Sequence, residues 1–454
     1  MSYLGPVIAI LFIIIVARLL LKKFYPHAVL LIAGLLMLAA SYWLPGHEPA
    51  VALTGGPFGF DLFRYINSSF AQTNASVGLM IMAIGGFVAY IDNIGASEAL
   101  VYLALKPLQL FKKYPYLAAV LVIPIGQLLF ICIPSAAGLG LLLMASVFPI
   151  LINLGVSRLS AVSVITSCTA MGMGPASAIT ASATSIIEKD TVFYFLKEQI
   201  PLAIPLSITM MIAYYFVNRY YDKKMDREQA PVPKIEKAEL KAPLYYAVIP
   251  VLPLILLILF SQLFDFFAVP IELNTTTVMF ISLFVAFAFE LIRKRQPREV
   301  FKSLSIFWNG MGNIFKTVVT LIIAADIFSK GLISLGFIDG LVGASQNLGF
   351  GGIGVGIVMT IMIFLASVLM GSGNASFFAF GPLVPKIAAQ LGVESSSIIL
   401  PMQFSASMGR TVSPVAGVLI ATAEVAEVSP FEIVKRNIIP LSAALVVMII
   451  YLYL

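Results

Sequence analysis

The sequence predicts an all-α polytopic membrane protein built from two inverted-topology repeats of five spans each, with re-entrant hairpins and broken helices. Three observations predict this fold. The 454 residues are 60% hydrophobic and only 11% charged, with a mean hydropathy of +1.00. Apolar runs of crossing length recur along the chain, and one arrangement of small polar residues occurs twice. A soluble domain could not expose so much apolar surface to water, so most of the chain must lie in lipid.

The internal repeat joins a tip of small residues to an interrupted apolar helix. In the first copy Ser135 lies in the tip, and a Gly-rich break ends at Pro175. In the second copy Ser372 lies in the tip, and the break ends at Pro414. The residue numbers differ by 237 between the two serines and by 239 between the two prolines. Duplicated tips and interrupted helices of this kind point to the binding site of a secondary transporter.

The first predicted repeat covers residues 1–217 and contains both single spans and longer apolar stretches. A crossing helix needs about 17 to 25 apolar residues. On that criterion the repeat contains, in order, spans at 4–21, 27–44 and 77–92, a hairpin at 115–152, a broken helix at 159–187 and a span at 200–217.

The second predicted repeat covers residues 244–454 and follows a polar cytoplasmic linker at 218–243. It contains, in the same order, spans at 244–264, 275–292 and 311–329, a hairpin at 350–388, a broken helix at 396–424 and a span at 437–454. Segments 95–112 and 332–347 are expected to be matching amphipathic connectors.

The two hairpin stretches, 115–152 and 350–388, are longer than one span, and each has Gly, Ser and Ala clustered in its middle. Two ordinary antiparallel helices that reach the far side remain one interpretation. We favour tips that stop near the midplane, because backbone left unpaired by such a cluster is tolerated at depth only beside protein or a water cavity.

The basic residues orient the predicted topology. An odd number of crossings inserts the second repeat upside down, and most Lys and Arg side chains then fall on one side. The other side keeps only Arg64, Lys189, Lys197 and Lys330. The positive-inside rule places both termini in the periplasm. Full crossing by the hairpins would leave this parity unchanged, so the charges orient the chain without testing re-entrance.

Four polar clusters lie where lipid-facing helices should have none: Ser135, the triplet Ser167-Cys168-Thr169, the tip Ser372–Ser376 and the segment Ser405–Ser413. Burying an unpaired polar group costs about 1–3 kcal/mol. We therefore expect a polar ligand and ions to complete their hydrogen bonding. Close helix packing is the alternative use of small residues, and it suits Gly85-Gly86 and Gly351-Gly352 better than these clusters.

Two charged residues lie within apolar segments. Arg410 is expected inside the second break, where a guanidinium could hold a carboxylate through two parallel hydrogen bonds. N-termini of broken helices would add positive partial charge and N–H donors. As alternatives, Arg410 pairs with a structural carbonyl or with Asp326. Asp326 itself could bind a proton or a cation, or neutralise Arg410 or Lys330.

The composition and motifs argue against several other classes of protein. Two cysteines in apolar segments exclude a disulfide framework, and two histidines are too few for metal chemistry. Metalloprotease, hydrolase-elbow and phosphate-loop motifs are absent from the sequence. A membrane-embedded enzyme pairing Ser372 with Lys386 is the weakest alternative, and a sensor would need a soluble output domain. The net charge of +6 follows the membrane sides and does not indicate a nucleic-acid partner.

Several motifs resemble the anaerobic four-carbon-dicarboxylate carrier (DcuC) family, nearly from end to end. The motifs are Gly371-Ser372-Gly373-Asn374-Ala375, the run from Gly409 to Gly417, and Ser429-Pro430-Phe431-Glu432. The resemblance implies the ion-transporter-superfamily fold, a homodimer, and elevator movement of transport domains in the bacterial inner membrane. It also implies fumarate, succinate, malate or aspartate as substrates, coupled to protons or sodium or exchanged. A superfamily carrier of another organic anion is the alternative.

The candidate site combines both tips and both breaks. The expected substrate-binding residues are Ser135, Ala136, Thr169, Ser372, Gly373, Asn374, Ser405, Ser407, Arg410 and Thr411. The coupling-ion candidates are Gly138, Ser167, Cys168, Gly172, Asp326, Ser376 and Ser413. Sodium is the candidate metal, and no organic cofactor is expected. The first break is less polar than in the family pattern, and neither tip has the Ser-Asn-Thr triplet of sodium-coupled relatives, which leaves the substrate and the ion open.

Overall fold

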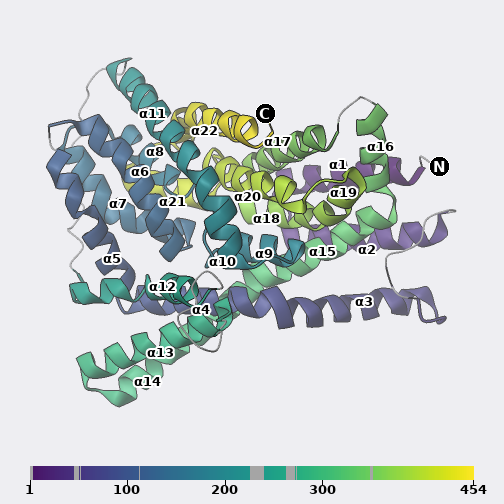
Figure 1. Ribbon diagram of the computed structural model, residues 1–454, viewed down its shortest axis with the longest axis horizontal. Helices are drawn as coiled ribbons and strands as arrows, with labels where there is room; N and C mark the ends of the chain where they lie inside the picture. Colours follow the sequence, from purple (N-terminus) through teal and green to yellow (C-terminus); the bar gives the residue numbers. More distant parts are fainter. Residues whose placement is uncertain are drawn as a thin grey trace.

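The computed structural model describes residues 4–44, 51, 53–111, 113–224, 240–261, 271, 273–347 and 351–453, and these form helices and connecting turns without any strand (Figure 1). Within these residues, ten helical stretches are long and apolar enough to cross a membrane. The all-helical membrane fold predicted from the sequence is therefore confirmed. Most of the predicted linker, 225–239, lies outside the described residues.

The helices of the first half are α1 (Leu4–Leu21), α2 (Pro26–Trp43), α3 (Phe58–Thr73), η1 (Asn74–Gly78), α4 (Leu79–Asn93), α5 (Ala96–Leu105), η2 (Lys106–Phe111), α6 (Pro115–Cys132), α7 (Ala136–Asn153), α8 (Arg158–Ser167), α9 (Ala178–Ile187), α10 (Thr191–Tyr194), η3 (Phe195–Gln199) and α11 (Ile200–Lys224).

The helices of the second half are η4 (Leu244–Val248), α12 (Leu252–Leu259), α13 (Thr275–Lys294), α14 (Pro297–Ile314), η5 (Phe315–Val319), α15 (Thr320–Ser334), α16 (Phe337–Asn347), α17 (Gly352–Met370), α18 (Gly373–Phe380), η6 (Gly381–Leu383), α19 (Val384–Leu391), α20 (Ser395–Thr411), α21 (Gly417–Ala426) and α22 (Pro430–Tyr453).

The same order of helices occurs in both halves. The third apolar span of each half belongs to a long helix with a π-helical turn in its middle, which is η1 at Asn74–Gly78 in the first half and η5 at Phe315–Val319 in the second. A short helix follows each long one, after a glycine with positive φ: Gly95 at 81° and Gly336 at 71°. Only glycine adopts that conformation without strain. The connectors expected at 95–112 and 332–347 begin at these turns.

Three predicted spans differ from the observed helices. The spans at 77–92 and 311–329 are the apolar ends of continuous helices of 36 and 38 residues, Phe58–Asn93 and Pro297–Ser334. Hydropathy missed their first halves, α3 and α14, because these are amphipathic. The span expected at 244–264 is a 3₁₀ turn followed by the eight-residue α12. Pro250 and Pro253 lack the backbone N–H that a continuous helix there would need.

The long helices form one layer of the molecule, with α3–α4 running horizontally through the lower half of the view and α14–α15 crossing it diagonally from the lower left (Figure 1). They approach closely where α4 meets α14, since a Cβ on Gly310 would lie 2.7 Å from the Cβ of Ala89 and 2.9 Å from the carbonyl oxygen of Gly85. The prediction that Gly85-Gly86 serves close packing is confirmed. The hairpins and the broken helices lie above α3–α4 in this view (Figure 1).

Each hairpin packs against the broken helix of its own half. In hairpin 1 (α6–α7), a Cβ on Gly126 would lie 2.2 Å from Sγ of Cys168, at the start of the first break. In hairpin 2 (α17–α19), a Cβ on Gly371 would lie 2.9 Å from the carbonyl oxygen of Val415, in the second break. The repeat seen in the sequence is thus also present in the structure, where each tip packs against the break of its own half.

Candidate functional site

Both hairpin tips end in the N-terminus of a helix. Ser135 caps α7, and its Oγ accepts a hydrogen bond from the backbone N of Gly138 at 3.2 Å. Ser372 caps α18 in the same way, accepting from the backbone N of Ala375 at 3.3 Å. Free backbone N–H groups and positive partial charge at these two N-termini favour an anion.

The two breaks differ in length. The first leaves Cys168–Ser177 outside regular helix, because Gly174 has a φ of 97° and Pro175 follows it. The second leaves only Val412–Ala416, around Pro414. The prediction that Ser405, Ser407 and Arg410 lie in the break is therefore wrong: they lie in the continuous helix α20, and Arg410 is in its last turn.

The second tip, helix α20 and the first break lie against one another in that order. A Cβ on Gly373 would lie 2.7 Å from the carbonyl oxygen of Ala406, and a Cβ on Gly172 would lie 2.5 Å from Oγ of Ser407. Side chains larger than hydrogen at these glycines would push the three elements apart. The structure thus brings together Gly172, Gly373 and Ser407, which the sequence placed in three separate clusters.

Arg410 extends from α20 to the first half of the chain. One terminal guanidinium nitrogen donates to the carbonyl oxygen of Thr169, and the group lies 6.0 Å from the ring centre of Phe130 in hairpin 1. Its Nε is buried and makes no hydrogen bond. Among the described residues no carboxylate forms an ion pair with this guanidinium. The expected carbonyl partner is present, but it pairs with only some of the N–H donors of the guanidinium.

The remaining substrate candidates separate by exposure. Ser135, Ala136, Ser372 and Asn374 are partly exposed, whereas Thr169, Ser405, Ser407 and Thr411 are buried. The buried hydroxyls of Thr169, Ser405 and Thr411 donate to backbone carbonyls one turn earlier in their own helices or at the start of the break. Ser372 and Asn374 therefore keep accessible polar groups at the second tip, as Ser135 does at the first.

Among the coupling-ion candidates, Ser413 is the one with unused hydrogen-bonding capacity. Its Oγ is fully buried and has no hydrogen-bond partner within the part of the chain that the structure describes. Ser167 and Cys168 donate to the carbonyl oxygen of Val164, and Ser376 hydrogen-bonds Ser367. The backbone N of Gly138 donates to the capping residue Ser135, and the carbonyl oxygen of Gly172 accepts from Gln403 at 2.7 Å. Ser413 and Arg410 thus leave two unpaired buried polar atoms at the end of α20.

Asp326 does not belong to this group. Its carboxylate accepts hydrogen bonds from Tyr65 at 3.0 Å and from Ser69 at 3.1 Å, both on α3. Within the described residues it makes no ion pair with Arg410 or Lys330. The structure places Asp326 between the long helices, where two hydroxyl donors satisfy it.

Three buried amide side chains that the sequence reading missed hold the breaks. Gln403 donates to the carbonyl oxygen of Gly172 at 2.7 Å and to Thr180 at 2.8 Å, and it accepts from Tyr194 at 3.0 Å. Gln199 accepts from the backbone N of Gly174 at 2.9 Å. The amide of Asn437 donates to the carbonyl oxygen of Thr411 at 2.9 Å and to Thr166 at 3.1 Å.

Gln199 and Asn437 are repeat-related, since their numbers differ by 238 and each precedes one of the repeated prolines, Pro201 and Pro440. An amide inside an apolar run was the available signal. Gln403 belongs to the second half but supports the first break, so it joins the two repeats.

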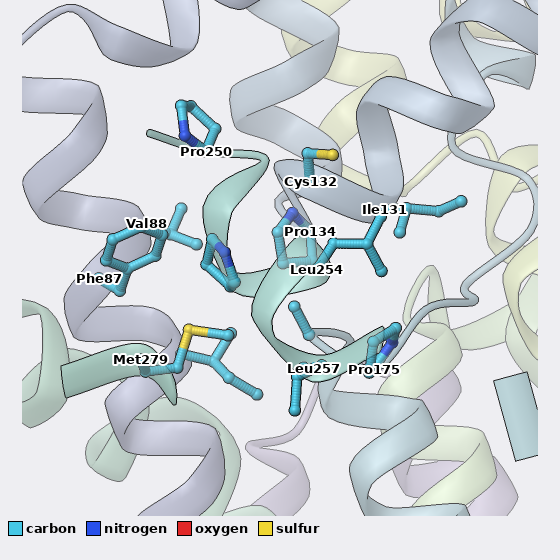
Figure 2. A pocket seen from close by; sticks show the side chains of 13 residues that line it. Phe87, Val88, Ile131, Cys132, Pro134, Pro175, Pro250, Leu254, Leu257 and Met279 are labelled. Carbon is cyan, nitrogen blue, oxygen red and sulfur yellow. The ribbon is translucent and has the colours of Figure 1, made fainter. Parts of the chain in front are cut away.

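A cavity of about 10 Å³ lies where the first tip meets the layer of long helices (Figure 2). Ile131, Cys132 and Pro134 of the tip face Val88 of α4 and Leu254 of α12 across it (Figure 2). This volume holds about one water molecule. The cavity is too small and too apolar for a dicarboxylate, and it marks the contact of hairpin 1 with α4 and α12.

Comparison with known proteins agrees with the predicted resemblance. The model of a family described as the C4-dicarboxylate anaerobic carriers (DcuC) matches residues 4–454. The anaerobic C4-dicarboxylate transporter DcuC of Escherichia coli strain K12 is 34% identical over 454 residues, which cover 99% of this chain and 96% of that protein. A probable DcuC transporter of Vibrio cholerae is 35% identical over 435 residues, covering 94% and 93%. These relatives are named as transporters, which agrees with the prediction of a carrier rather than an enzyme.

Two solved structures share the fold. MtrF of Neisseria gonorrhoeae, described within a class of antimetabolite efflux pumps, gives a TM-score of 0.59 at 13% identity and covers 94% of this chain and 95% of that one. The YdaH transporter of Alcanivorax borkumensis gives 0.60 at 13% identity, covering 94% and 98%. The first is described within a class of efflux pumps and the second as a transporter, and the shared fold confirms the predicted all-α polytopic membrane class.

Proposed function

The chain belongs to the DcuC family of C4-dicarboxylate carriers, and from this premise we propose that it transports fumarate, succinate, malate or aspartate across the bacterial inner membrane. The protein is a multi-pass membrane transporter with ten apolar spans among its described residues. Substrate choice, coupling and mechanism are parts of the proposal.

One observation carries the proposed site: Arg410 has an incompletely paired guanidinium between the two repeats. A buried cation with free N–H donors is costly unless an anion completes its hydrogen bonds. In this proposal one carboxylate binds the free edge of Arg410. The backbone N–H groups at the N-terminus of α18, with Ser372 and Asn374 beside them, bind the same substrate.

The packing directions of the helices support inverted repeats. Gly34 of α2 lies against Phe328 of α15, and Met37 against Gly331, so these helices run parallel. Gly85 lies against Ile314 and Ala89 against Gly310, so α4 and α14 run antiparallel. With five crossings per repeat, both directions follow if the second repeat is upside down, and neither follows if it is not. This arrangement also puts both termini on one side of the membrane, and the distribution of basic residues favours the periplasm as that side.

Alternating access by an elevator movement is our proposed mechanism. The hairpins, the broken helices, α11 and α22 would move together, with each tip carried on its break. The position of the tips beside the breaks supports re-entrance. The first break separates two half-helices of ten residues, each about 15 Å long, so the break and the tip beside it lie partway across the membrane.

Coupling to a cation, or exchange for another dicarboxylate, would offset the electrical work of importing a dianion. That work is about 2.3 kcal/mol per charge per 100 mV. Ser413 Oγ and nearby carbonyl oxygens are the proposed contacts for sodium, which takes oxygen ligands as other hard cations do. Protons are the alternative coupling ion.

A homodimer is proposed from the exposed faces of α3 and α14. The polar side chains of Ser68 and Gln72 on α3 and Ser76 on η1 are exposed on a membrane-length helix, as are those of Asn309 and Asn313 on α14 and Thr317 on η5, and the two sets differ by 241 in number. Polar groups facing lipid are costly, so a second copy of the chain would cover these stripes.

Uptake into proteoliposomes tests the proposed function. Labelled succinate and fumarate would be offered with a sodium gradient, a proton gradient or internal dicarboxylate imposed separately. Accumulation under one driving force identifies the coupling. Silence under all three, with inserted and folded protein, would favour a carrier of another organic anion, an alternative that the less polar first break also raises.

Replacing Arg410 tests the site. Arg410→Ala and Arg410→Lys should each lose nearly all dicarboxylate uptake, because lysine keeps the charge but not the fork that binds a carboxylate bidentately. Arg219→Ala, at the exposed end of α11, is the matched control and should transport normally. Normal uptake by Arg410→Ala, measured with equal insertion and folding, would remove Arg410 from the site.

A further inference from the structure

A cavity of about 480 Å³ lies between hairpin 2 and the helices α1, α2 and α15. All of its lining residues are apolar, among them Ile13 and Leu21 of α1, Leu30 of α2, and Leu365 and Ala366 of α17. A dicarboxylate would lose its hydration there without gaining a partner. The cavity is therefore separate from the proposed substrate site.

The cavity opens toward the lipid-facing surface. Three of its lining residues on α17, Ile361, Leu365 and Leu369, are 41%, 53% and 51% exposed. In a protein that crosses the membrane, the medium at such apolar side chains is the hydrocarbon of the bilayer. The nearest available molecule that can enter is an acyl chain.

The corresponding space in the first half is closed. There, α12 and Pro250 pack against the tip of hairpin 1 and leave only about 10 Å³ (Figure 2). α1 holds the matching position beside hairpin 2 and contacts α17, but it leaves the cavity of about 480 Å³ next to this contact. The difference between the two halves leaves room for one additional slender apolar group.

Three cations lie at one end of the cavity. Arg18, Lys22 and Lys23 are exposed, and they flank Leu20 and Leu21, which line the cavity. Among the described residues these cations form no ion pair. Basic side chains at the end of a crossing helix attract the phosphate of anionic lipids.

From this geometry we infer that one anionic phospholipid binds between α1 and hairpin 2. Its phosphate lies at Arg18, Lys22 and Lys23, and one acyl chain lies in the cavity. A lipid in this cavity lies between α1 and α17. Hairpin 2 can therefore move closer to α1 only after the lipid has left. A moving hairpin 2 would then sense the lipid composition.

The full-length protein in nanodiscs, with phosphatidylglycerol carrying a photoreactive acyl chain, provides the test. We expect labelling to concentrate on peptides of α1 and α17 rather than on α11 or α22. Ala366→Phe, which fills the cavity, should remove most of the α17 label. Ala213→Phe, at a similarly half-exposed position on α11, should not.

The phosphate contact has its own variant and control. Arg18→Gln/Lys22→Gln/Lys23→Gln should weaken phosphatidylglycerol binding, followed by native mass spectrometry, by about tenfold or more. The matched triple variant Arg219→Gln/Lys223→Gln/Lys224→Gln, also an exposed arginine and two lysines ending a helix, should change it little. All four variants must remain monodisperse.

Three results would overturn the inference. Labelling spread evenly over lipid-facing helices would show no bound lipid. Labelling that Ala366→Phe leaves unchanged would place the chain elsewhere. Cross-links from a photoreactive group at Ile361 to a second copy of the protein would show that another protomer covers the cavity instead.

Discussion

At the scale of single residues, Gln403 supports the first break more directly than any residue within that break. Gln403→Leu would leave the Gly172 carbonyl and the Tyr194 hydroxyl without their buried partner, while Thr180 would keep its bond from Gln199 at 3.1 Å. Each such group costs about 1–3 kcal/mol. We expect a lower thermal unfolding temperature and a loss of uptake, because the backbone around Thr169 that receives Arg410 would be free to shift.

Gln390→Leu is the control for this substitution. Gln390 is exposed on α19, so the same change there should alter neither the unfolding temperature nor uptake. If Gln403→Leu matched this control in both measurements, Gln403 would have no positioning role.

The sequence could reveal Arg410 but not Gln403, and the reason is physical. An arginine in an apolar run is expensive wherever it lies, so its presence alone signals a partner. A glutamine costs less to bury, so its presence alone does not signal a partner. Its role here depends on Gly172, which lies 231 residues away in the chain. Asp326 shows the opposite error. Its charge predicts a role in the site, but Tyr65 and Ser69 satisfy the carboxylate away from that site.

At the scale of elements, the contact between α20 and the first break depends on Gly172. Gly172→Ala would place a methyl group 2.5 Å from Oγ of Ser407, and overpacking of this kind costs about 1–3 kcal/mol. We expect reduced uptake and stability. Ser407→Ala should restore most of both in the double variant, because Cβ of Ser407 is 3.7 Å from the added group and the closest remaining contact is the Ile179 methyl group at 3.1 Å.

This rescue separates two explanations. If the double variant is as impaired as Gly172→Ala alone, the glycine is needed for its backbone conformation or for a ligand, and not for the contact with α20. Ser407→Ala by itself should transport nearly normally, because its Oγ makes no hydrogen bond to the first break.

The repeats and breaks were predictable as elements, while their extents were not. Gly174 and Pro175 mark the first break in the sequence because both disfavour helix. Around Arg410 the sequence contains similar small residues, but no glycine with positive φ directly precedes Pro414, and α20 stays helical as far as Thr411. Hydropathy likewise found α4 and α15 but missed the amphipathic halves α3 and α14, whose polar faces indicate a neighbour rather than a loop.

At the scale of the whole molecule, those polar faces predict contact between two copies. A single cysteine at Asn313, in a background with Cys132 and Cys168 replaced by Ala, should form a cross-linked dimer in membranes on mild oxidation. The lipid-facing position Ile208 on α11 is the control and should not. Dimers at Ile208 but not Asn313 would place the interface elsewhere. Free accessibility of Asn313→Cys to a charged thiol reagent would indicate a water-filled surface.

The elevator proposal makes the last prediction, because it requires hairpin 1 to leave its contact with α4. Val88 of α4 and the natural Cys132 of the first tip line the same small cavity (Figure 2). In Val88→Cys, a short bismaleimide should join the two thiols and stop uptake, since α4 would then restrain the moving unit. The same reagent should leave uptake intact in Val88→Cys/Cys132→Ala, where no bridge forms. Buried Cys168 should not react in either protein. Full transport by protein shown to be cross-linked would mean that hairpin 1 and α4 stay together through the cycle. Access would then have to alternate by movements of the tips alone.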